Sequence, residues 1–120
     1  MNDFFSYRLI SQEDAKFSVN IDLVADHKIY EGHFPSIPIT PGVCQVQMVK
    51  EVLEDILCKK FSMTAARDIK FLAMINPNEV SHAKLDVSYI ILEDGKYQVT
   101  ALMASESVKY LKLRADYCEK

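Results

Sequence analysis

The residues whose types and spacing could carry chemistry lie together between positions 31 and 54. Three of the four prolines and two of the three glycines fall in this segment, and they stiffen a loop that holds one histidine, His33. An imidazole with a pKa near about 6.5 exchanges a proton close to neutral pH. The loop runs directly into a helical pattern, so His33 is expected beside a helix N-terminus. A rigid titratable ring in such a place is typical of a site that moves protons.

The helix that follows must position this loop. Thr40 suits the N-cap, and Pro41 is tolerated at the first helical position because its missing N–H would be unpaired there. Apolar residues then recur at helical spacing and cover more than half of the circumference, which predicts a helix wrapped on most sides. They are Val43, Val46, Val49, Val52, Leu53, Ile56 and Leu57. The remaining sector holds Gln47, Lys50, Glu51 and Glu54.

Alternating and β-branched patterns predict antiparallel strands around that helix. The expected strands cover residues 4–10, 15–24, 63–74, 80–92, 97–104 and 108–117, with turns at 11–14, 76–79 and 93–96 and a loop over 25–39. The chain is therefore expected to be one α+β domain spanning residues 1–120, with one long central helix and five to six strands. A sheet of this size leaves an edge to be covered, which favours a dimer.

Composition excludes several classes of function. The chain has 120 residues and a net charge of −3 without a cluster of basic residues, so nucleic-acid binding is not expected. It shows neither a signal-peptide pattern nor an apolar run long enough to insert in a membrane. Three cysteines without zinc-ligand spacing predict free thiols and a cytoplasmic protein.

Several short runs carry a resemblance to a known family. They are Gly-His-Phe-Pro at 32–35, Pro38, Pro-Gly-Val at 41–43, Ile-Lys-Phe at 69–71 and Asn-Pro-Asn-Glu at 76–79. Their order and spacing resemble the β-hydroxyacyl-acyl-carrier-protein dehydratases of the hotdog fold. The resemblance implies a curved antiparallel sheet around the helix, and homodimers with active sites at the subunit interface, in some members assembled as trimers of dimers. It also implies a 3-hydroxyacyl substrate on the phosphopantetheine arm of acyl carrier protein, with no metal or redox cofactor.

The resemblance assigns roles to individual positions. His33 matches the base that removes the proton next to the thioester carbonyl, and Gly42 matches the residue whose backbone N–H points at that carbonyl. Phe34, Val43 and Phe71 are also expected to bind the substrate, and Phe71 is a candidate, with Met74 and Tyr89, to line an acyl tunnel. Each role has a structural alternative: a carbonyl hydrogen bond for His33, close packing for Gly42, and a place in the ordinary core for Phe71, as for Met74 and Tyr89.

The third catalytic position departs from the family. The dehydratases carry Glu or Asp on the helix where this chain has Gln47. A carboxylic acid can assist departure of the hydroxyl, whereas an amide cannot give up a proton at accessible pH. Gln47 is therefore expected to orient the hydroxyl or a water. Glu51, one turn along the same face, is the alternative acid, and Glu54 is a more remote one. A solvated polar stripe is the competing interpretation of all three.

Three functional hypotheses follow. The first is a dehydratase acting on carrier-bound 3-hydroxyacyl thioesters in fatty-acid, related lipid or polyene biosynthesis. The second is a hotdog thioesterase or isomerase, and the third is a non-catalytic subunit that binds the acyl carrier or pairs with an active relative. Metal binding by His27 or His82 is not expected, because no carboxylate pair completes a site. A weak cationic signal for an acidic carrier protein comes from Lys28, Lys59, Lys60, Arg67 and Lys70.

Overall fold

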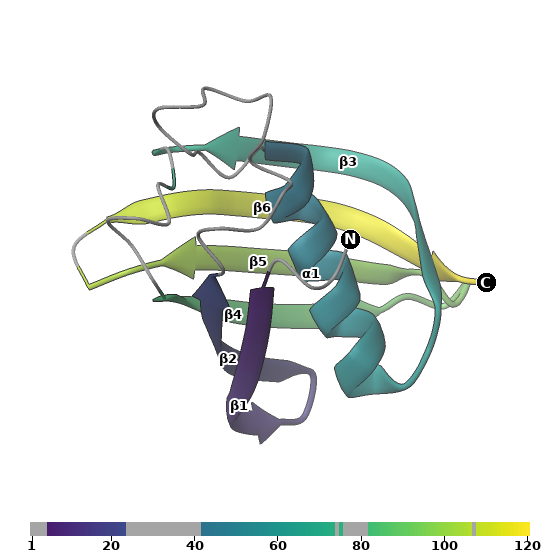
Figure 1. Ribbon diagram of the computed structural model, residues 1–120. Coiled ribbons are helices and arrows are strands. Elements are labelled where there is room, and N and C mark those ends of the chain that lie inside the picture. Colours follow the sequence, from purple (N-terminus) through teal and green to yellow (C-terminus); the bar gives the residue numbers. More distant parts are fainter. Residues whose placement is uncertain (1–4, 24–41, 74, 76–81, 107) are drawn as a thin grey trace.

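The computed structural model describes residues 5–23, 42–73, 75, 82–106 and 108–120. These residues form one helix and six strands (Figure 1). The elements are β1 (Phe5–Glu13), β2 (Lys16–Leu23), α1 (Gly42–Leu57), β3 (Phe61–Phe71), β4 (His82–Ile91), β5 (Tyr97–Ala104) and β6 (Lys109–Glu119). The predicted α+β class and strand number are confirmed.

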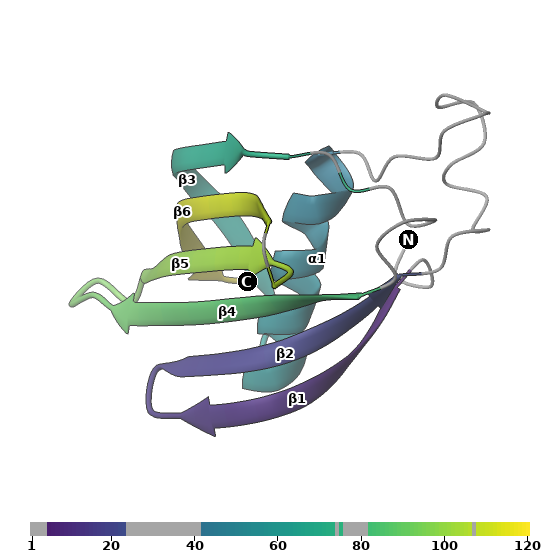
Figure 2. The same ribbon diagram turned by 90° about the vertical axis from the view of Figure 1, so that its left-hand side faces the viewer.

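All strands belong to one antiparallel sheet in the order β1-β2-β4-β5-β6-β3. Figure 2 shows this order, with α1 on one side of the sheet and the β1–β2 hairpin curving round beneath it. The helix has 16 residues, so at about 1.5 Å per residue it spans roughly 24 Å. The predicted helix start at Thr40 and Pro41 lies outside the described residues. No helix in the described part of the chain is long and apolar enough to cross a membrane.

The predicted turn at 11–14 is wrong. Strand β1 continues to Glu13, which pairs with Lys16, and the turn is confined to the two residues between them. Ala15 adopts a left-handed conformation there, with φ of 63°. A bulge between Leu9 and Ser11 shifts the register within β1. This extra residue breaks the regular alternation, so the sequence pattern ends earlier than the strand does.

The core lies between α1 and the inner face of the sheet. Met48, Val49, Val52 and Leu53 of the helix are fully buried. Burying side chains of this size contributes roughly 1.5–3 kcal/mol each. Alternate residues of the central strands meet them, which explains the period-two patterns of the sequence. These strand residues include Val19, Ile21, Leu85, Val87, Val99, Ala101, Leu111, Leu113, Ala115 and Tyr117.

The C-terminal end of α1 is closed by a left-handed residue. Cys58 has φ of 54°, and the Lys59 N–H donates to the Glu54 carbonyl at 3.1 Å. This is the hydrogen bond of a Schellman-type cap, normally made with glycine in the left-handed position. The cap turns the chain directly into β3, so it fixes the angle between the helix and the edge strand.

Candidate active site at the start of the helix

The first half of the predicted site lies outside the described residues. His33 and Phe34 belong to this part of the chain, as do His27 and Lys28. The described part of the site therefore begins at Gly42, the first residue of α1. The N–H groups of a first helical turn have no partner within the helix and lie at the positive end of its dipole. Gly42 accordingly occupies the kind of position that the predicted carbonyl donor requires.

The aromatic ring of Phe71 lies against Gly42. A Cβ added to Gly42 would lie 2.9 Å from Cζ of Phe71 and 3.1 and 3.2 Å from its two Cε atoms. A Cβ at this position would therefore have to displace the ring tip. Phe71 pairs with Leu111 of β6 on the helix side of the sheet, yet its side chain is 52% exposed. The interpretation of Phe71 as ordinary buried core is therefore wrong.

Of Val43, Met74 and Tyr89, only the Tyr89 side chain lies within the described residues. Val43 is a residue of α1, but its side chain is outside the described set. Tyr89 is half-buried and packs against Tyr97, with ring centroids 5.6 Å apart. Tyr89 therefore joins the aromatic edge of the core, as the structural alternative for this residue expects. Met74 lies outside the described residues.

The polar face of α1 is not a solvated stripe. Gln47, Glu51 and Glu54 are all half-buried. Oε2 of Glu54 accepts the Phe61 N–H at 2.8 Å, which ties the helix to the start of β3. Oε2 of Glu51 is buried and has no hydrogen-bond partner among the described residues. The interpretation of these residues as a solvent-facing surface is therefore wrong.

Among the described residues, Glu51 is the best candidate for a general acid. Burial raises the pKa of its carboxyl above its ordinary value, while a hydrogen bond with the Gln47 side chain acts in the opposite direction. A carboxyl whose pKa is raised keeps its proton to higher pH and can act as a general acid. Because the amide is one turn away on the same face, Gln47 and Glu51 form a linked polar pair.

The structure does not bring Gly42 and Gln47 to one face of the helix. Their positions differ by five, and at about 100° per residue this places their Cα atoms roughly 140° apart around the axis. It does bring Gly42 to Phe71 and Gln47 to Glu51. The described site residues of one chain therefore form two groups, one at the start of α1 and one further along its polar face.

A cleft of about 900 Å³ adjoins the second group. It lies between β1 and the C-terminal half of α1, and Glu51, Asp55 and Tyr7 contribute to its wall. The Tyr7 hydroxyl donates to Oδ2 of Asp55. Burial, together with Asp55, raises the pKa of Tyr7 well above its ordinary range. This cleft has no signal in the sequence, because residues 4–10 show only a strand pattern and Tyr7 belongs to no motif.

Other reactive side chains lie apart. Cys44 is buried, Cys118 is half-buried and Cys58 is exposed, and all three are free thiols. Burial raises the pKa of the Cys44 thiol, so this group is poorly suited to nucleophilic chemistry. His82 is an exposed residue at the start of β4. No group of three or more metal-ligating side chains occurs within the described ranges.

Comparison with known protein families gives a match between this chain and a dehydratase family. The family model described as ApeI-like, ApeI dehydratase, matches residues 9–110, a span that contains every predicted site residue. No curated protein sequence matches the chain.

Two solved structures share the fold. One is the dehydratase heterocomplex ApeI:P from Xenorhabdus doucetiae, with 18% identity, a TM-score of 0.72, and coverage of 92% of this chain and 94% of that one. The other is an uncharacterized protein from Erwinia carotovora subsp. atroseptica, with 17% identity, a TM-score of 0.55, and coverage of 96% and 92%. At such identities the likeness shows the fold alone.

Proposed function

This chain belongs to the ApeI-like dehydratase family, and from that premise we propose that it dehydrates 3-hydroxyacyl thioesters carried by acyl carrier protein. The observation that carries the proposal is the family match over residues 9–110, which spans the whole loop-helix motif. The burial of the polar helix face supports it, because a half-buried amide and carboxyl are suited to a site that excludes water.

Each step of the reaction has a candidate group. His33 removes the proton next to the carbonyl, and the N–H of Gly42 stabilises the charge that develops on the carbonyl oxygen. Gln47 holds the 3-hydroxyl by hydrogen bonding, and Glu51 supplies the proton with which that hydroxyl leaves as water. General acid catalysis is worth roughly 10²–10⁴-fold. A site that relies on a more remote acid is therefore expected to be slower than one with a carboxyl at position 47.

The two-group arrangement favours a site shared between subunits. The N–H of Gly42 points along the helix axis at the start of α1, whereas the Gln47 side chain projects from the side of the helix about 7.5 Å further along. A homodimer, or a trimer of dimers built from it, would let Gly42 of one subunit and Gln47 of the other serve the same pocket. The substrate would reach this pocket on the phosphopantetheine arm of the carrier.

The test is turnover of 3-hydroxyacyl-carrier substrates of several chain lengths, followed as enoyl product and as free thiol. Enoyl formation that is lost in His33→Ala and increased at least about tenfold in Gln47→Glu is the expected result. Gln12→Glu is the matched control, because Gln12 is an exposed amide on β1. Release of free thiol without enoyl product would assign a thioesterase instead. Folded protein without turnover at any chain length would exclude the enzyme.

A second candidate is a subunit that works only with an active relative. The amide at position 47 favours it, as does the likeness to the Xenorhabdus doucetiae protein, which is a dehydratase heterocomplex. In this arrangement the relative would supply the missing carboxyl across the interface. Mixing this chain with such a relative should then raise dehydration above the sum of the two alone. An unchanged sum, together with turnover by this chain alone, would reject it.

A further inference from the structure

The face of the sheet opposite α1 carries a strip of cations at its β3 edge. We call Arg67, Lys70, Lys112 and Arg114 the basic strip. Lys112 and Arg114 alternate with the buried Leu111, Leu113 and Ala115 of β6, so their side chains point away from the helix. All four are exposed, although the chain as a whole has a net charge of −3. These four cations therefore lie close together although the chain as a whole is acidic.

Internal carboxylates neutralise only half of the basic strip. Nε and Nη2 of Arg67 donate to the same Oδ2 of Asp116, at 3.1 and 2.6 Å, and the Asp116 side chain is only 3% exposed. Lys70 lies 3.7 Å from Asp68 in an exposed pair. Neither Lys112 nor Arg114 forms an ion pair within 4.0 Å with any described residue, although Asp68 is the cross-strand neighbour of Arg114.

One cross-strand pair within the strip is electrostatically unfavourable in the isolated chain. Lys70 of β3 lies directly opposite Lys112 of β6 in the antiparallel register. Like charges in this position destabilise a sheet. An anionic partner would remove that penalty, whereas solvent screening only reduces it. The arrangement is thus better suited to a bound acidic surface than to solubility alone.

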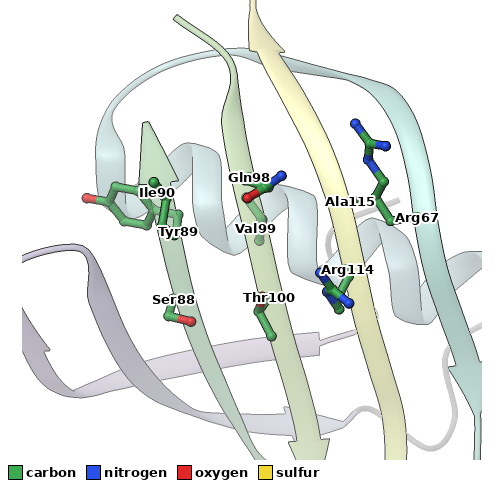
Figure 3. Close-up of a pocket in the computed structure, with 9 residues that line it drawn as sticks. All are labelled: Arg67, Ser88, Tyr89, Ile90, Gln98, Val99, Thr100, Arg114 and Ala115. Carbon is green, nitrogen blue, oxygen red and sulfur yellow. The ribbon is translucent and has the colours of Figure 1, made fainter. Parts of the chain in front are cut away.

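A hollow of about 280 Å³ adjoins the strip (Figure 3). Its wall contains the guanidinium groups of Arg67 and Arg114 and no carboxylate, and its uncharged polar members are Gln98, Thr100 and Ser88. Figure 3 shows that Arg114 and Arg67 come from the neighbouring strands β6 and β3, on one side of Gln98 and Thr100. Because Arg67 is already paired with Asp116, Arg114 is the cation of this hollow that can receive an acidic side chain, together with the neutral polar groups.

The strip also ends at the candidate active site. Lys70 and Lys112 are the neighbours along their strands of Phe71 and Leu111, which pair with each other. One residue advances a strand by about 3.4 Å, and the ring of Phe71 touches Gly42. A partner docked on the strip would therefore lie at the end of the sheet where α1 begins.

We propose that the basic strip is the docking surface for the acidic acyl carrier protein, with Arg114 and Lys112 as its unpaired anchors. This inference rests on the proposed function. It also changes which of the cations suggested by the sequence are expected to contact the carrier protein. Lys59 pairs with Glu119 at 3.0 Å near the opposite end of the sheet, Arg67 is held by Asp116, and Lys70 contributes as part of the strip. Lys112 and Arg114 belong to no sequence motif, and only the register of β6 with β3 places them beside Lys70 and Arg67.

The test compares two double charge reversals. Lys112→Glu with Arg114→Glu removes the anchors, and Lys16→Glu with Lys96→Glu makes the same change in net charge beside the β1–β2 and β4–β5 turns. Affinity for fluorescently labelled holo-carrier is measured at low and physiological salt. kcat/KM is measured in parallel with a 3-hydroxyacyl-carrier and with the same acyl group on free pantetheine. Circular dichroism confirms that both variants fold.

The anchor variant should raise the Kd for holo-carrier at least about tenfold, and the control variant less than about twofold. The kcat/KM of the anchor variant should fall at least about tenfold more with the carrier substrate than with the pantetheine substrate. Equal losses with both substrates, equal effects of both variants, or a wild-type Kd in the anchor variant would overturn the proposal. Absence of carrier binding by the wild-type protein would also overturn it. Turnover of the pantetheine substrate would then test the proposed dehydration independently of carrier binding.

Discussion

Replacing Gly42 with alanine should lower the activity of this protein while leaving its stability nearly unchanged. The new Cβ would lie 2.9 Å from Cζ of Phe71, closer than carbon atoms normally approach, so one of the two must move. The contacted atoms form the tip of a side chain that is 52% exposed. The ring can therefore swing away at lower cost than the helix start can shift.

The expected change in stability is small because two contributions oppose each other. Alanine is favoured over glycine by up to about 1 kcal/mol within a helix and by less at its first residue. A displaced aromatic rotamer costs roughly 0.5–1.5 kcal/mol. The free energy of unfolding of Gly42→Ala should therefore stay within about 1 kcal/mol of wild type. Activity should fall about tenfold or more, because small displacements of positioning groups have large effects on rate.

Urea unfolding and kcat/KM on one thioester substrate measure the two quantities. Phe71→Leu in the Gly42→Ala background is the decisive control, because it removes the ring tip that the Cβ meets. This double variant should recover at least part of the lost activity. A loss of more than about 3 kcal/mol in stability would show that the helix start moves instead of the ring. Wild-type activity in Gly42→Ala would show that the ring has no part in the site.

Three further predictions concern single side chains. Tyr117→Phe should raise the free energy of unfolding by about 1 kcal/mol, because the buried hydroxyl has no hydrogen-bond partner among the described residues. Glu54→Ala should lower it by about 1–2 kcal/mol in urea unfolding, because the Phe61 N–H loses its acceptor, while Glu54→Gln should cost less. Burial raises the pKa of Glu51 from 4.5, so the folded state holds this proton more tightly than the unfolded state. Wild type should thus lose stability relative to Glu51→Gln as the pH rises from about 4 to about 7.

Each of these predictions has an outcome that contradicts it. A destabilised Tyr117→Phe would reveal a partner for the hydroxyl. Equal losses in Glu54→Ala and Glu54→Gln would show that charge matters more than the hydrogen bond to Phe61. A difference between wild type and Glu51→Gln that stays constant from about pH 4 to about pH 7 would show that the Glu51 carboxyl titrates as an ordinary exposed group.

The sequence predicted the class of the fold because its strands alternate and its helix is strongly apolar. The strand at Tyr97–Ala104 was predicted with the observed bounds, and Leu57, the last apolar residue of the helical pattern, is the last residue of α1. Errors arose where local irregularities shift the pattern. The bulge between Leu9 and Ser11 concealed the end of β1.

The site was less predictable because its features depend on contacts between distant residues. A motif pointed to Gly42 and Gln47, but nothing local in the sequence indicates that Phe71 touches the glycine. The burial of Glu51 results from its packing in the folded chain, and its spacing on the helix is equally compatible with a solvated face. Lys112 and Arg114 became candidates only through the register of β6 with β3.

The position of β3 in the sheet also determines when the protein can finish folding. Its only strand neighbour among the described elements is β6, and the first pair, Phe61 with Glu119, joins residues far apart in the sequence. During synthesis on the ribosome, β3 must therefore wait until residues 72 to 108 and then β6 have been made. Until then the apolar side of α1 lacks part of its cover. Such non-local pairing slows folding and lengthens exposure to aggregation, so a chaperone that shields α1 and β3 should raise the yield of folded chains.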